Sequence, residues 1–216
     1  MNQCLGYHAN HIGQTATSKG FSSFYSPQFQ QKIIKIKPGE IYCSDRKELI
    51  ATGLGSCICV CAWDPYKGIG GINHFLLPNQ DHRHHWNRSE AESNESRYGQ
   101  HAMELLINGL IQLGADKYNL HFKLFGGASM FQQNECVGER NIEFMRHFVK
   151  QEKLVIDNHD LGGNCARKVI FEPTTGKAWL KRITMNVKAA EQEKEYHHLL
   201  AKELEKQVQQ SNVELF

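Results

Sequence analysis

Apolar residues follow two different spacings along this chain. Short apolar runs that end at Gly, Pro, Asn or Asp predict strands, whereas apolar residues three or four positions apart predict amphipathic helices. The predicted helices lie at residues 98–113 and 141–152. The predicted strands lie at residues 57–63, which follow a Gly-punctuated entry from residue 49, and at residues 70–77, 120–125, 154–156, 167–171 and 178–183. Because strands and helices interleave, we expect an α/β (mixed α+β) fold, with a layered mixed β-sheet and flanking helices.

Two segments carry turn residues between short apolar runs and are predicted to be hairpins. In residues 32–44, Pro38-Gly39 separates two alternating runs. Near the other end of the predicted sheet, the sequence EPTTGK separates residues 167–171 from residues 178–183. We expect each pair of runs to form neighbouring strands.

The patterned part of the chain is flanked by two segments of different character. Residues 1–31 are polar and are predicted to form an N-terminal extension, and residues 32–185 are predicted to form one domain. Residues 186–216 are charged and are predicted to form a C-terminal helix. Within the domain, residues 79–97 are polar without apolar periodicity, which is typical of a functional or mobile loop.

Composition and charge exclude several classes of protein. The chain has 216 residues, of which 40% are hydrophobic, and its formal net charge is +2, from 25 basic and 23 acidic residues. This balance gives no electrostatic footprint for nucleic acid. The longest nearly apolar stretch covers only residues 54–63, which is too short to span a membrane, and the N-terminus has no signal-peptide pattern. We therefore expect a cytoplasmic protein with reduced cysteines and no membrane insertion.

Common catalytic and cofactor motifs are absent from the sequence. Gly53-Leu54-Gly55 has Ile58 where a dinucleotide-binding loop needs its third glycine. There is no P-loop, no HExxH and no CxxC, which excludes the zinc-peptidase and thioredoxin signatures. No cofactor and no metal are predicted.

A cysteine and a histidine on neighbouring predicted strands suggest nucleophilic catalysis. A Gly-rich turn places Cys57 at the start of a buried strand, and His74 lies on the next strand. Sequential strands often pair, so the thiol and the imidazole can face each other, and the histidine can take the thiol proton. Backbone N–H groups around Gly55 and Ser56 are candidates for stabilising an oxyanion. The structural alternative is that Cys57 packs as a small hydrophobic residue.

Several ordered blocks of sequence resemble the CheD family of chemoreceptor glutamine deamidases. The segment LGSC ending at Cys57 is followed by Asp64-Pro65 and by the block GINHFLLP around His74. Further similar blocks are PGE at residues 38–40, RYG at 97–99, KLFGGASM at 123–130, GERN at 138–141 and DLGGNCARKVIF at 160–171. Together they cover roughly residues 33–183, which makes the resemblance far more specific than the Cys/His pair alone.

The resemblance implies an activity and a set of site residues. Members of that family hydrolyse side-chain amides of specific glutamines on the cytoplasmic helices of methyl-accepting chemotaxis receptors, and their fold is distantly like that of deamidating toxin domains. The nucleophile maps to Cys57 and the general base to His74. The family pattern has a threonine that orients the histidine six positions before the cysteine, where this chain has Ala51; we assign the role to Thr52. The oxyanion site or cleft is assigned to Gly55, Ser56, Gly126 and Gly127.

Two alternative functions remain open at this point. Members of the resembled family also bind a CheC-type phosphatase, so the chain is alternatively a chemotaxis adaptor without catalysis. The alternating Cys57, Cys59 and Cys61 share one strand face and, with His74, suggest a thiol or metal sensor; packing is the simpler explanation for them. The polar cluster DHRHH at residues 81–85 is interpreted as a solvated loop near the substrate groove.

Overall fold

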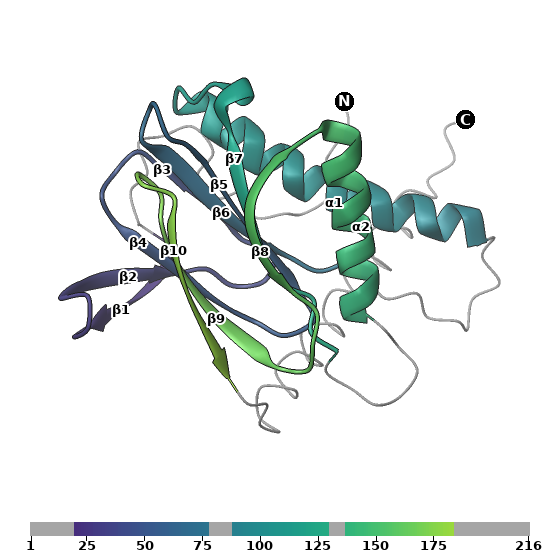
Figure 1. The fold of residues 1–216 in the computed structure, drawn as a ribbon, viewed down its shortest axis with the longest axis horizontal. Coiled ribbons are helices and arrows are strands. Elements are labelled where there is room, and N and C mark those ends of the chain that lie inside the picture. Colours follow the sequence, from purple (N-terminus) through teal and green to yellow (C-terminus); the bar gives the residue numbers. More distant parts are fainter. Residues whose placement is uncertain (1–19, 78–87, 130–136, 184–216) are drawn as a thin grey trace, which may run out of the picture.

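A computed structural model describes residues 20–77, 88–129 and 137–183, with the side chains of residues 88–96 left out (Figure 1). These residues form two five-stranded sheets and two α-helices. The first sheet has the order β1 (Ser22–Ser26), β2 (Gln31–Lys35), β4 (Leu49–Leu54), β9 (Ala166–Glu172) and β10 (Lys177–Ile183). The second has the order β3 (Ile41–Ser44), β6 (Ile69–Phe75), β5 (Ile58–Asp64), β7 (His121–Gly126) and β8 (Val155–Leu161).

Both sheets are mixed. In the first sheet β2 and β4 are parallel, whereas β4 and β9 are antiparallel. In the second sheet β7 and β8 are parallel, and β5 is antiparallel to both of its neighbours. The α+β class and the layered arrangement that the sequence predicts are confirmed, but the strands form two sheets where one was expected.

Side-chain alternation on β5 explains why the fold has three layers. Cys59, Cys61 and Trp63 point into a core between the two sheets, together with Ile50 and Phe171 of the first sheet. The intervening residues of β5 point into a second core, against the helices. Because every residue of β5 is buried, the strand lacks the polar alternation of a half-exposed strand.

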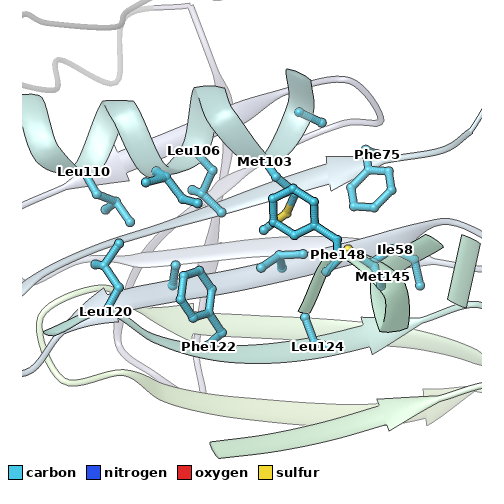
Figure 2. Close-up of a cluster of buried hydrophobic side chains, with 14 of the residues drawn as sticks. Ile58, Phe75, Met103, Leu106, Leu110, Leu120, Phe122, Leu124, Met145 and Phe148 are labelled. Carbon is cyan, nitrogen blue, oxygen red and sulfur yellow. The ribbon is translucent and has the colours of Figure 1, made fainter. Parts of the chain in front are cut away.

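The two helices cover the outer face of the second sheet. Helix α1 (Arg88–Gln112) contributes Met103, Leu106 and Leu110, and α2 (Val137–Glu152) contributes Met145 and Phe148. Figure 2 shows these side chains meeting those of the strands, including Phe75 of β6 and Phe122 of β7. The apolar stripes that the sequence predicts on both helices therefore face the core. Among the described residues, no helix is sufficiently long and apolar to cross a membrane.

The predicted hairpin at residues 32–44 is wrong. Strands β2 and β3 flank the Pro38-Gly39 turn but belong to different sheets, because β2 pairs with β4 and β3 pairs with β6. A turn signal shows where the chain reverses, but it does not determine which strands then pair. The other predicted hairpin is confirmed, since β9 and β10 are antiparallel neighbours.

Several element boundaries differ from the predicted ones. Helix α1 begins at Arg88, so part of the predicted loop 79–97 is helical, and α2 begins four positions earlier than predicted, at Val137. Strand β1 lies within the predicted N-terminal extension and pairs with β2. Polar sequences conceal both features, because a polar strand at a sheet edge and a polar helix end carry little apolar periodicity. The predicted C-terminal helix 186–216 lies outside the described residues.

Candidate active site

Cys57 lies in the turn that carries the chain from the first sheet to the second. Strand β4 ends at Leu54 and β5 begins at Ile58, so the Gly-rich segment between them crosses between the sheets. Cys57 is 3% exposed and belongs to the core between the sheets. The predicted position at the start of a buried strand is confirmed.

His74 lies on β6, beside the start of β5. Its pairing partner in the β5–β6 register is Cys59, and the next pair toward the turn is Ile58 with Phe75. Cys57 directly precedes that pair, so Cys57 and His74 are diagonal neighbours on one face, a separation that an imidazole can bridge. The backbone of His74 is held by the turn before β3: its N–H donates to Glu40 O, and its carbonyl accepts from the Gly39 N–H.

Thr52 meets His74 from the opposite sheet. The Thr52 Oγ1 atom lies 2.7 Å from His74 Nδ1 and also donates to the Ile36 carbonyl at 3.1 Å. Since its own hydrogen is used on that carbonyl, the hydroxyl must accept at His74, and Nδ1 must carry the proton. In the described part of the chain, His74 Nε2 is the buried side-chain polar atom without a hydrogen-bond partner. This arrangement leaves Nε2 with a lone pair that can accept a proton.

Burial keeps His74 neutral. The side chain is 2% exposed, and desolvation lowers its pKa from the ordinary 6.5 to about 3. A neutral imidazole with Nδ1 protonated has the protonation state that a general base needs at neutral pH.

Three consecutive backbone carbonyls around Cys57 are held by hydrogen bonds. Gly55 O accepts from the Ala128 N–H at 2.9 Å, and Cys57 O accepts from the Gly127 N–H at 2.8 Å. Between them, Ser56 O accepts from Asn141 Nδ2 at 2.8 Å. The turn is therefore fixed on one side by the segment that follows β7 and on the other by α2.

Gly126 and Gly127 support the turn from close range. Gly126 has φ +115°, and a Cβ placed on it would lie 2.0 Å from Cys57 O, which only glycine avoids. Because the Gly127 N–H donates to Cys57 O, this N–H is used within the protein. Both glycines were predicted to belong to the oxyanion site or cleft; in the structure they hold the turn that carries Cys57.

A buried arginine organises the loop that borders Gly126. Arg167 donates through Nε to Asp160 Oδ1 at 2.7 Å and through its terminal nitrogens to the carbonyls of Gly162 and Cys165. The Gly162 N–H in turn donates to Gly126 O at 2.9 Å. Burial by itself would raise the pKa of the Asp160 carboxyl, but the guanidinium groups of Arg167 and Arg182 hold that pKa below its usual value. Arg167 therefore supports the site indirectly: it holds Gly162, which in turn holds Gly126 next to Cys57 O.

The two cysteines of β5 belong to the packed core. Cys59 and Cys61 are fully buried, with their sulfur atoms 3.9 Å apart, and burial raises the pKa of the Cys59 thiol. No group of three His, Cys, Asp or Glu residues within the described ranges is placed to hold a metal ion. The DHRHH cluster at residues 81–85 lies outside the described residues.

Comparison with known proteins assigns the chain to a family. A family model described as CheD chemotactic sensory transduction matches residues 76–182. The probable chemoreceptor glutamine deamidase CheD of Vibrio vulnificus (strain CMCP6) is 47% identical over 212 residues, covering 96% of this chain and 97% of that protein. This chain belongs to the CheD family.

Other CheD relatives extend the match across different organisms. The probable chemoreceptor glutamine deamidase CheD of Vibrio cholerae serotype O1 (strain M66-2) is 44% identical over 195 residues, covering 89% of this chain and 83% of that protein. The protein of the same name from Halorhodospira halophila (strain DSM 244 / SL1) is 39% identical over 196 residues, covering 89% and 88% of the two chains. The family model begins after His74, whereas these relatives span far more of the chain.

Two buried polar residues that support the candidate site were not predicted from the sequence. Asn141 and Arg167 each lie within blocks that carried the family resemblance, GERN and DLGGNCARKVIF. Nothing in their spacing indicates that Asn141 reaches the Ser56 carbonyl or that Arg167 reaches the loop beside Gly126, because both residues are distant in sequence from Cys57. A usable signal was the polar side chain itself, since an asparagine at an apolar-face position of a predicted helix needs a buried partner.

Proposed function

We propose that this protein is a glutamine deamidase that converts specific glutamines of methyl-accepting chemotaxis receptors to glutamate. The curated CheD relatives are named chemoreceptor glutamine deamidases. The observation that carries the proposal is the contact between Thr52 Oγ1 and His74 Nδ1, which directs the basic Nε2 atom away from Thr52. With Cys57 as a diagonal neighbour of His74, the site has a nucleophile, a base and a group that orients the base.

The proposed reaction has two stages. His74 Nε2 accepts the Cys57 thiol proton, and the thiolate forms a bond to the side-chain carbonyl carbon of the receptor glutamine. The C–N bond then breaks, His74 returns the proton to the leaving ammonia, and a thioester remains on Cys57. In the second stage His74 takes a proton from water, which attacks the thioester and releases glutamate and the thiol.

The protonated histidine forms beside a negative charge. Burial disfavours a charged imidazole in the resting protein. The thiolate or oxyanion that appears during the reaction lies near the imidazolium and offsets that cost, and Thr52 accepts from Nδ1–H throughout. In this proposal the oxyanion accepts from backbone N–H groups near Ser56 and Cys57.

The proposed substrates also define where the protein acts. Receptor glutamines of this kind lie on cytoplasmic helices, so the proposed location is the cytoplasm, with those helices as the main partners. Binding of a CheC-type phosphatase stays a prediction of the family resemblance. The proposed reaction needs no metal and no cofactor.

Peptide mass spectrometry on a purified receptor cytoplasmic fragment tests the function. The fragment is incubated with the wild type, with Cys57→Ala and with Cys59→Ala, and glutamine-to-glutamate conversion is mapped. Cys59 is a matched control because it is buried on the same strand face and pairs with His74. We expect conversion by the wild type and by Cys59→Ala, and none by Cys57→Ala.

Other outcomes lead to different conclusions. If Cys59→Ala lost conversion while Cys57→Ala kept it, the nucleophile would be Cys59 and not Cys57. No conversion by a wild type that still binds the fragment would favour the adaptor function over the enzyme.

A further inference from the structure

Asn141 connects the nucleophile turn to the strand that carries His74. It lies on α2, is fully buried and uses both ends of its amide. Its Nδ2 donates to Ser56 O at 2.8 Å, and its Oδ1 accepts from the Leu77 N–H at 2.9 Å, just beyond β6. The orientation of this amide is unambiguous, because a carbonyl can only accept and an N–H can only donate.

The bond to Ser56 O sets the direction of the next N–H. In a trans peptide, the C=O and N–H groups point in opposite directions within one plane. Holding Ser56 O therefore fixes the Ser56–Cys57 peptide plane, and with it the N–H of Cys57. The carbonyls of Gly55 and Cys57 accept from backbone N–H groups, whereas the carbonyl of Ser56 accepts from the Asn141 side chain. Of these three hydrogen bonds, only the one to Ser56 can therefore be removed by a side-chain substitution.

We propose that Asn141 is a positioning residue that aims the Cys57 N–H at the oxyanion formed during deamidation. This rests on the proposed function, in which the carbonyl oxygen of the glutamine becomes negatively charged. An oxyanion donor acts through its direction, so a peptide plane that is free to rotate loses stabilisation of the transition state while the thiol itself remains in place.

Two reactions of Cys57 separate this role from a merely structural one. Deamidation passes through an oxyanion. Alkylation by iodoacetamide is a displacement at a saturated carbon, in which Cys57 S gains a bond to carbon and iodide leaves, so no oxyanion forms. A residue that only keeps the fold or the thiol in place affects both reactions, whereas a residue that aims an oxyanion donor affects deamidation alone.

The test compares Asn141→Asp with Asn73→Asp. Asn73 is a matched control because it is a buried asparagine with the same bonding: it accepts from the Val60 N–H and donates to Ala102 O, on the helix-facing side of β6. Each variant keeps the size and the acceptor and loses the amide donor. For each, kcat and KM for the receptor fragment, the rate of Cys57 alkylation read by peptide mass, and Tm are measured.

For Asn141→Asp we expect kcat to fall about 10–100-fold, somewhat less than when an oxyanion donor is deleted outright. The rate of Cys57 alkylation in Asn141→Asp should stay within about threefold of the wild-type rate. In Asn73→Asp, both kcat and the rate of Cys57 alkylation should stay within about threefold of the wild type. Both variants are expected to lower Tm. If Asn141→Asp does not fold, Asn141→Ser, which introduces no charge and no longer reaches Ser56 O, should show the same split.

Three results would overturn the proposal. Wild-type kcat in the folded Asn141 variants would show that the bond to Ser56 does not matter for catalysis. A parallel fall of deamidation and alkylation would reduce Asn141 to a structural residue. A wild type that converts no glutamine would refute the proposed function itself, and this proposal with it; that result is distinguished from the others because it appears without any substitution.

Discussion

The hydroxyl of Thr52 determines which tautomer of the candidate base is favoured. It donates to Ile36 O and accepts from His74 Nδ1, so one tautomer of the histidine is favoured and the ring is held in one orientation. Aspartate fills the equivalent position in many catalytic triads, where its charge stabilises the imidazolium. A neutral threonine orients the ring without that charge, which fits a histidine that burial keeps neutral in the resting protein.

Thr52→Val tests this role with an isosteric side chain. Removing the hydroxyl leaves His74 Nδ1–H and Ile36 O without this partner, and we expect kcat/KM to fall about 10–100-fold, as when the partner that orients a metal-bound histidine is removed. Thr52→Ser keeps the hydroxyl and should stay within about threefold of the wild type. Receptor-fragment deamidation followed by mass spectrometry measures both. Full activity of Thr52→Val would show that the Thr52 hydroxyl is not needed to orient His74 for catalysis.

At the scale of elements, the site depends on a crossing between two sheets. Strand β4 presents Thr52 from the first sheet, and the turn after it delivers Cys57 to the second sheet, where β6 presents His74. The segment after β7 locks this crossing through the Gly127 and Ala128 N–H groups. The three candidate catalytic residues thus come from both sheets, and the crossing turn sets their relative positions.

Substituting Gly126 tests this lock. Gly126→Ala combines an unfavourable φ of +115° with a Cβ that would lie 2.0 Å from Cys57 O, whereas Gly163→Ala has a φ of +73° and no heavy atom within 4 Å. The control should therefore lose about 1–2 kcal/mol of unfolding free energy from backbone strain alone. Gly126→Ala should lose about 1–3 kcal/mol more, in the range of overpacked sites, together with activity. Urea denaturation of both variants measures the difference, and equal losses would contradict the close contact.

At the scale of the whole molecule, the site lies inside the core that holds the two sheets together. Thr52, Cys57 and His74 are each at most 3% exposed, among the apolar side chains of both sheets. A buried titratable group such as His74 makes the free energy of unfolding depend on pH, because a charge on it loses its hydration in the folded state. The same burial that keeps His74 neutral therefore makes folding sensitive to acid.

The pH dependence of stability follows from the lowered pKa of His74. Between its ordinary pKa of 6.5 and its folded pKa of about 3, the unfolded chain binds a proton that the folded protein does not. Unfolding free energy should therefore fall as pH decreases below 6.5, with His74 contributing up to about 1.4 kcal/mol per pH unit. His74→Gln lacks this contribution, so its stability should fall less steeply. Urea denaturation between pH 7.5 and 4 compares the slopes, and identical slopes would show that His74 does not carry the effect.

Local pattern was sufficient for most elements. The runs that became β5, β6, β7, β9 and β10 and the stripes of α1 and α2 were predicted because apolar periodicity directly reflects which face is buried. The partner of each strand was less predictable. Strands β2 and β3 were expected to pair with each other, yet they lie in different sheets, because pairing depends on contacts between segments distant in sequence.

For the candidate site, the reactive groups could be identified from the sequence alone: a cysteine after a Gly-rich turn, a histidine on the next strand and a threonine shortly before the cysteine. Side chains alternate along a single extended strand, so Thr52 and Cys57, five positions apart, would point to opposite faces of such a strand. Packing overrides this alternation, because the chain changes sheets between the two residues and Thr52 faces His74 across the core. Asn141 likewise reaches Ser56 from a helix that lies far along the chain. Chemical identity is a property of single residues, whereas direction and distance are set by the packing of two sheets and a helix.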